Sequence, residues 1–290
     1  MKFENTKSYN FEGAFRGMRN PMNSWDKSDS CFGIVDILNT DALTDVADAW
    51  IMKENDDRIK NGLEPYMENP NGSLLYYEAL ERYDEWLSSQ GILSSNENYD
   101  GLYNVAFIGP NDMSLAQRLI LAGEEHAKFL RQIFVCVDIT APLYWWKQFD
   151  TYKIGTVANS TSTMHKLSAI PITRDIFEFD NLDIPVASGT APHGGEWELT
   201  FEDYVDDIID MCENLRIKFN ETADSRYWNA LVAILPNAYL QKRTVTMSYA
   251  NLRNMYFQRH THKLKEWHQF CDEWIPILPY SKELITLGGK

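Results

Sequence analysis

The hydrophobic positions along the chain follow two periods, which predict helices mixed with short strands. Several segments repeat apolar residues every three or four positions, as helices with one buried face do. Short apolar runs at 32–38 and 134–139 predict strands instead. The segments expected to be helical are 41–59, 73–91, 114–123, 141–153, 201–219, 225–234, 249–259 and 263–274.

Local start signals support several of these helices. Ser114 with Gln117 predicts a capping box, and Thr200 with Asp203 predicts another. Ser248 is expected to cap the helix that follows it. In the helix after Thr200, the residues spaced for one buried face are Tyr204, Val205, Ile208, Ile209, Cys212 and Leu215. Segments 1–30, 154–165 and 170–200 are expected to be loops or irregular structure.

Composition and charge narrow the classes of partner. The chain has a net charge of −15, which disfavours binding to duplex nucleic acid or to an anionic membrane. No apolar run approaches the ~20 residues of a membrane span. The first residues have neither an apolar core nor a small-residue cleavage site, so we expect a cytoplasmic protein.

Common catalytic and metal motifs are missing from the sequence. It contains no glycine-rich phosphate loop, no zinc-protease motif and no nucleophile elbow. Cysteines form no closely spaced pair, so scattered reduced thiols are expected. His260, His262 and His268 invite a metal site, but histidines two apart on a helix do not share a face. We therefore expect no metal.

Two segments gather groups that suit a phosphate. The first, 148–163, follows an aromatic helix with a cation and then many hydroxyl and amide side chains. The second, 242–263, brings further lysine and arginine residues into an otherwise acidic chain. Alternatively, the first segment is an ordinary Ser/Thr-rich turn, and the cations favour the helix dipole. The residues by themselves leave both interpretations open.

The segment 141–168 resembles the signature region of the flavin-dependent thymidylate synthases. The family pattern has an Ala-Pro start, a glutamine after the helix and a closing segment. These features align with Ala141-Pro142, Gln148 and 166–168 of this sequence. The strand 130–139 is similar to the strand that precedes this helix in the family. Further on, 234–236, 251–259 and the helix from Lys263 resemble later family elements, so the likeness covers roughly 112–275.

The resemblance implies an α+β fold with a central sheet packed against long helices. It implies a thymidylate synthase-like core at 106–290, with 1–105 as an N-terminal extension packed on it. The family transfers a methylene group from methylenetetrahydrofolate to dUMP, with reduced FAD as hydride source and NADPH as reductant. A pyrimidine nucleotide partner and a homotetramer are implied as well.

The same resemblance assigns roles to individual residues. It implies Arg259 as the catalytic residue, lying against the pyrimidine. The residues implied to bind the nucleotide are Gln148, Thr161, Ser162, Thr163, Lys242 and Arg259. Those implied to bind the flavin are His126, Thr151, Tyr152, Lys153, Asn159 and Lys263.

The chain also departs from the family pattern. The family's Arg-His-Arg triplet is Thr151-Tyr152-Lys153 here, its Ser-x-Arg is 161–163, and a helical arginine is Ala250. Replacing guanidinium by ammonium is not neutral at a site that binds a ligand through two parallel hydrogen bonds. Three hypotheses follow: a flavin-dependent enzyme, a nucleotide-binding protein that has lost the reaction, and a structural protein whose loop binds nothing.

Overall fold

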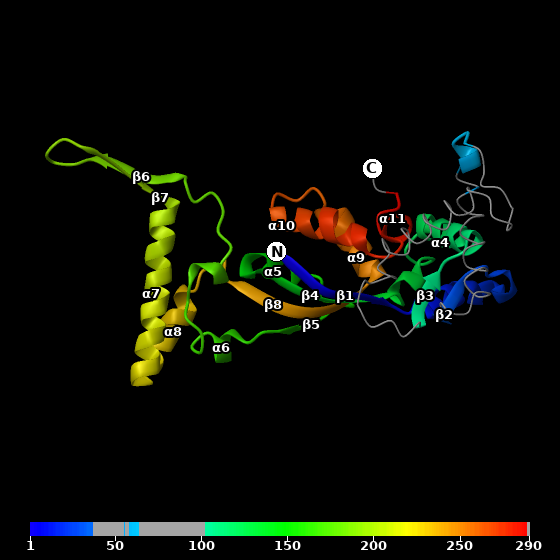
Figure 1. Ribbon diagram of the computed structural model, residues 1–290, viewed down its shortest axis with the longest axis horizontal. Coiled ribbons are helices and arrows are strands. Elements are labelled where there is room, and N and C mark those ends of the chain that lie inside the picture. Colours follow the sequence, from blue (N-terminus) through cyan, green and yellow to red (C-terminus); the bar gives the residue numbers. More distant parts are fainter. Residues whose placement is uncertain (37–54, 56–57, 64–101, 289–290) are drawn as a thin grey trace. The chain divides into compact units, whose positions relative to one another are not determined.

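The computed structural model describes residues 1–36, 55, 58–63 and 102–288 (Figure 1). The predicted helices at 73–91 and over most of 41–59 lie outside these residues. The chain forms two compact units: the first comprises 1–6 with 136–246, and the second comprises 7–135 with 247–290. The division predicted at residue 105 stays a prediction.

A four-stranded sheet is the central element of the fold. Its strands lie in the order β1, β4, β8 and β5. These strands are β1 (Lys2–Tyr9), β4 (Phe134–Pro142), β8 (Leu240–Ser248) and β5 (Val157–Ser160). Buried and less buried residues alternate along β4, so one face of the strand packs on a core. The predicted α+β class, with a sheet and helices, is confirmed.

The α-helices of the first unit are α5 (Leu143–Phe149), α6 (Thr163–Lys166), α7 (Phe201–Thr222) and α8 (Ser225–Ile234). Helices α7 and α8 begin where the sequence predicts, at 201 and 225. The capping box of Thr200 with Asp203 is present, because the Thr200 amide donates to the Asp203 carboxylate at 2.7 Å. Val205, Ile209 and Cys212 are buried as expected, whereas Tyr204 is exposed.

Helices of the second unit enclose another core. They are α1 (Phe11–Arg19), α4 (Pro110–Ala122), α9 (Tyr249–Arg259), α10 (Lys265–His268) and α11 (Ser281–Leu284). The predicted Ser248 cap is confirmed, with Asn251 completing a capping box. Helix α10 continues into a π-helical turn at Gln269–Trp274, so the predicted helix of this region is confirmed over most of its length. An antiparallel pair, β2 (Cys31–Asp36) with β3 (Leu102–Phe107), confirms the first predicted strand.

Several expectations about local structure are wrong. The helix predicted to start at Ser114 begins at Pro110, and the one predicted for 141–153 ends at Phe149. The expected loop 1–30 contains β1 and α1, and the expected loop 154–165 contains β5 and α6. The expected irregular region 170–200 contains a hairpin of β6 (Pro185–Thr190) and β7 (Glu196–Thr200) (Figure 1). Strand β8 follows α8, where no strand was predicted.

A buried ion pair fixes the segment after α1 in the second unit. Arg19 donates from Nε to Asp112 Oδ1 at 2.5 Å, and the Asp112 side chain is fully buried. The other carboxylate oxygen accepts from the hydroxyls of Ser28 and Ser30, each at 2.5 Å. The guanidinium also donates to the carbonyls of Ser24 and Lys27. Removing one partner would leave a buried charge without compensation.

We therefore expect Asp112→Asn to lower the free energy of unfolding by about 3–5 kcal/mol, the usual cost of breaking a buried pair. Chemical denaturation measures this change. The matched control is Glu12→Gln, which removes an exposed pair with Arg16 and should leave the stability unchanged. Equal stabilities of the two variants would contradict the role assigned to Asp112.

Candidate functional site

Hydrogen bonds from side-chain hydroxyls to backbone carbonyls hold the loop that leaves α5. The hydroxyl of Thr151 donates to the carbonyl of Gln148 at 2.7 Å and so caps the end of the helix. The hydroxyl of Thr156 donates to the carbonyl of Tyr152. Between them Gly155 has φ of 79°, a left-handed conformation that favours glycine. The loop is therefore a closed turn that leads directly into β5.

Strand β5 is an edge strand whose residues are all exposed. It pairs antiparallel with β8, so that Asn159 lies opposite Thr244 and Ser160 lies opposite Arg243. It stands last in the sheet, and β8 is its partner among the described strands. An edge strand presents backbone donors and acceptors as well as side chains. Asn159 and Ser160 therefore offer an amide and a hydroxyl on opposite faces of this edge, and Thr161 follows with a second hydroxyl.

Arg243 anchors this strand and the loop before it. Its guanidinium carbon lies 4.2 Å from the ring centroid of the fully buried Trp146. It donates to Asp150 Oδ1 at 2.6 Å and to Gln241 Oε1 at 3.0 Å. Gln241 in turn donates from Nε2 to the carbonyl of Thr161 at 3.0 Å. One arginine thus connects the loop, the central strand and the end of β5.

Lys242 is already neutralised within the first unit. Its ammonium lies 3.0 Å from Glu4 and 3.3 Å from Asp138. Hydrogen bonds from Thr244 (2.6 Å) and Asn5 (2.9 Å) hold the pKa of Asp138 below its usual value, with a further contribution from Lys242. The hydrogen bond to Glu4 raises the pKa of Lys242. Lys242 therefore offers a bound anion less attraction than a lone lysine would.

Lys153 contrasts with Lys242. Its side chain is exposed, and it forms no hydrogen bond or ion pair with the residues that the structure describes. It stands in the turn before β5, beside the exposed Thr151 and the half-buried Tyr152. Thr161 is also exposed, while Gln148, Ser162 and Thr163 are half-buried. Lys153 is thus a cation available to an anionic ligand in this part of the first unit.

Three of the sequence-predicted site residues belong to the second unit. The Arg259 guanidinium carbon lies 5.1 Å from the ring centroid of buried Trp267, so this side chain also has a packing role. Lys263 is exposed, and so is His126, whose Nε2 lies 3.6 Å from Glu125. The roles of these three residues in binding remain predictions.

The histidines of the second unit serve local structure. His268 contacts Asp272 (3.0 Å) through Nδ1 and the carbonyl of His262 (2.7 Å) through Nε2. The Asp272 contact and then the His262 carbonyl raise the pKa of His268. His262 accepts from the backbone amide of Leu264. Within the described residues no three metal-ligating side chains lie together, and no helix is long and apolar enough to cross a membrane.

Comparisons with known proteins found likeness only among solved structures. No family model and no curated protein matches the chain. Two structures of the flavin-dependent thymidylate synthase ThyX from Helicobacter pylori, each with FAD and dUMP, are 16% identical to it. Their TM-scores are 0.44 and 0.45, over 72% of this chain and 90% and 89% of theirs.

The UMP/dUMP methylase PolB from Streptomyces cacaoi, bound with 5-Br UMP, is 12% identical with a TM-score of 0.44. This likeness covers 61% of the chain and 83% of PolB. Likenesses at these scores establish neither what the chain binds nor what it catalyses.

The sequence placed Arg243 among the cations of segment 242–263 but did not predict that it anchors the site with Gln241 and Asp150. A partial signal exists in the alternation along β8, where Gln241, Val245 and Met247 are buried. Because Gln241 and Arg243 are polar, the pattern of hydrophobic residues in the sequence does not reveal that alternation.

We expect Arg243→Leu to lower the free energy of unfolding by about 1–3 kcal/mol, because it removes both the stacking on Trp146 and charged hydrogen bonds. Chemical denaturation followed by tryptophan fluorescence measures the loss. Arg226→Leu is the control, since Arg226 is 88% exposed and pairs only locally with Asp224. Indistinguishable effects of the two substitutions would show that Arg243 is not an anchor.

Proposed function

We propose that the chain binds a pyrimidine nucleotide at the polar edge formed by the loop 150–156, β5 and Thr161. We further propose that it acts as a flavin-dependent thymidylate synthase-like transferase. The observation that carries the binding proposal is an exposed edge strand with amide and hydroxyl side chains that follows the turn of the available cation Lys153. Such groups together suit a phosphate, which takes charged and neutral hydrogen bonds at several oxygens.

The nucleotide would be held by groups with different tasks. Lys153 supplies charge, while Asn159 and Thr161 supply an amide and a hydroxyl on the exposed edge. Gln148, Ser162 and Thr163 belong, with Thr161, Lys242 and Arg259, to the nucleotide set that the resemblance implies, whereas Lys153 and Asn159 are added to it here. Arg243 is a positioning residue, because it fixes the loop and the Thr161 carbonyl through Asp150 and Gln241.

FAD is the cofactor of this proposal. The resemblance implies Tyr152, Lys153 and Asn159 for FAD; because Lys153 and Asn159 are assigned here to the nucleotide, the half-buried Tyr152 is left to pack its aromatic ring against the flavin. Thr151 fits less well as a donor, because its hydroxyl donates to the Gln148 carbonyl. Bound reduced flavin would supply a hydride, with NADPH and methylenetetrahydrofolate as co-substrates.

A second candidate function is nucleotide binding without the transfer reaction. Two observations favour it. The family's first arginine position is a threonine whose hydroxyl caps α5, and Lys242 is neutralised by Glu4 and Asp138. Cations that polarise a uracil carbonyl are therefore fewer here than the family pattern requires.

We expect Lys153→Ala to weaken dUMP binding by about 10-fold or more, the effect of losing one charged hydrogen bond, with unchanged thermal stability. Isothermal titration calorimetry measures the dissociation constant. Lys27→Ala is the matched control, because Lys27 is also exposed but belongs to the second unit. Equal affinities of the Lys153 variant and the native chain would reject the site. No dUMP or UMP binding by the native chain would reject the nucleotide proposal.

The redox part of the proposal is tested by the absorbance spectrum of the purified, untagged protein. We expect flavin absorbance and release of FAD on heating, identified by mass spectrometry. A colourless protein that binds dUMP but takes up no added FAD would exclude the flavin-dependent reaction and establish the second candidate. Uptake of FAD without dUMP binding would instead point to a different flavoprotein.

A further inference from the structure

The β6–β7 hairpin has one apolar face and one polar face (Figure 1). In its register Gly189 lies opposite Trp197, and Ala187 lies opposite Leu199. Because residues directly opposite each other in an antiparallel pair share a face, these four residues form the apolar face of the hairpin. Trp197 is nevertheless 47% exposed and Leu199 is 37% exposed. The described residues therefore leave this apolar face open to solvent.

A close approach to β6 holds the Trp197 ring in place on the apolar face. A Cβ atom at Gly189 would lie 2.8 Å from Cζ2 of Trp197, which is too close for a side chain to fit. The ring therefore rests on the backbone of β6, and glycine allows this contact. An aromatic ring that is fixed on one side and exposed on the other is preorganised for a partner, because binding does not have to order it.

The opposite face of the hairpin is acidic. Glu196 lies opposite Thr190, and Glu198 lies opposite Ser188. Both glutamates are exposed. Neither forms a hydrogen bond or an ion pair with the residues that the structure describes. The polar face of the hairpin therefore carries two carboxylates that can pair with cations of another molecule.

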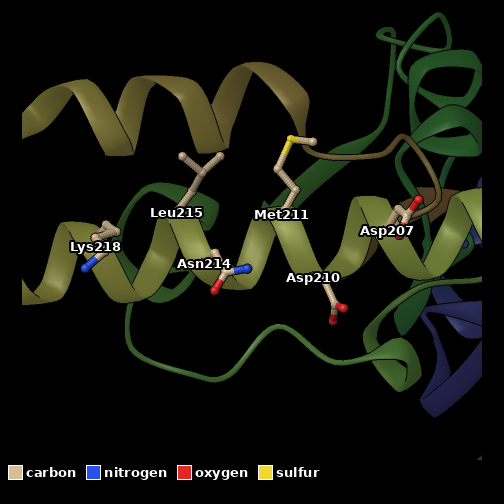
Figure 2. A pocket seen from close by; sticks show the side chains of 6 residues that line it. All are labelled: Asp207, Asp210, Met211, Asn214, Leu215 and Lys218. Atoms are coloured by element: carbon tan, nitrogen blue, oxygen red, sulfur yellow. The ribbon is translucent and has the colours of Figure 1, made fainter.

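The sequence around the hairpin is acidic as well. Residues 183–210 contain aspartates and glutamates but no lysine or arginine. Figure 2 shows two of these acids, Asp207 and Asp210, on α7. Arg174 pairs with two other acids of α7, at 2.9 Å each, and so neutralises part of the helix but not the hairpin. A surface of this charge attracts a cationic partner and repels an acidic one.

The outer edge of β7 suits an added strand. The hairpin is a two-stranded sheet, so that among the described strands β7 pairs with β6 alone. Strand β7 contains no proline. Strand β6 is a poorer template, because it begins at Pro185 and has an irregular register between Pro185 and Ala187. A strand added at β7 would bond to its main chain and place its own side chains alternately on the two faces.

We infer that the outer edge of β7 binds an extended segment of another protein in which basic and apolar residues alternate. The apolar side chains of that segment pack beside Trp197 and Leu199, and its lysine or arginine side chains lie beside Glu196 and Glu198 on the other face. A second copy of β7 fits less well, because an antiparallel copy centred on Glu198 would place one glutamate directly opposite another. The inference does not depend on the proposed nucleotide site.

Peptide binding to the full chain tests the edge directly. The probe is a fluorescein-labelled peptide in which lysine alternates with valine, titrated by fluorescence anisotropy at about 0.15 M salt, where distant exposed charges are screened. Two control peptides separate strand addition from attraction of charge alone. One has the same composition with its lysines and valines in separate blocks, and the other has the same sequence with N-methylated backbone amides. Each should bind about 10-fold or more weakly, because main-chain hydrogen bonds and alternation are both required.

A charge reversal on β7 should change which peptide binds. We expect Glu198→Lys to weaken binding of the lysine–valine peptide about 10-fold or more, because like charges then lie side by side. The same variant should gain affinity for a peptide in which glutamate alternates with valine. The matched control is Glu124→Lys, which changes the net charge equally at an exposed residue of the second unit and should leave both affinities unchanged.

The outcomes separate this partner from the alternatives. A native chain that does not bind the lysine–valine peptide would overturn the inference, and so would equal binding of this peptide and its two controls. Equal effects of Glu198→Lys and Glu124→Lys would also overturn it. If the native chain binds no peptide and Trp197→Ala dissociates an oligomer in sedimentation velocity, the apolar face belongs to a second copy instead. A reversed peptide preference in Glu198→Lys, with an unaffected control, would establish the edge as the binding site.

Discussion

The stacking of Arg243 on Trp146 is the interaction on which the candidate site depends. Trp146 is fully buried in the middle of the aromatic helix α5, and its ring nitrogen donates to the carbonyl of Gln241 at 2.9 Å. The guanidinium that stacks on this ring donates to the side chains of Asp150 and Gln241. A buried ring thereby fixes the position of a charged group, and the charged group fixes a loop and an edge strand. The polar segment behind the aromatic helix is therefore ordered structure.

The chain's acidity makes the state of each cation near the candidate site important. With a net charge of −15, an anion meets few attractive surfaces, so the state of each cation near the site matters. Lys242 and Arg243 lie side by side in sequence, yet acids already hold both. Lys153 stands apart from them in the turn before β5. Lys242 and Arg243 therefore support the fold, whereas Lys153 is available for binding an anion.

Sequence patterns predicted the long amphipathic elements and missed elements whose signals are not local. Helix α7 was found because its capping box and apolar period both lie within the helix. Helix α4 starts earlier than predicted because Asp29, distant in sequence, accepts from the backbone amides of Asn111 and Asp112. Strand β5 is exposed along its whole length, so no alternation of burial marks it. The site's hydroxyl and amide groups were visible in the sequence, but the network that orders them depends on pairing between β5 and β8.

The central claim is that a nucleotide binds at the loop and edge strand that Arg243 holds in place. Hydrogen–deuterium exchange with and without saturating dUMP tests this claim most directly, because backbone amides report ligand contact and ordering locally. The account predicts slower exchange in peptides that cover 150–163, with smaller changes in peptides that lie wholly in α7. Slower exchange confined to α7, or none at 150–163 while dUMP is bound, would contradict it.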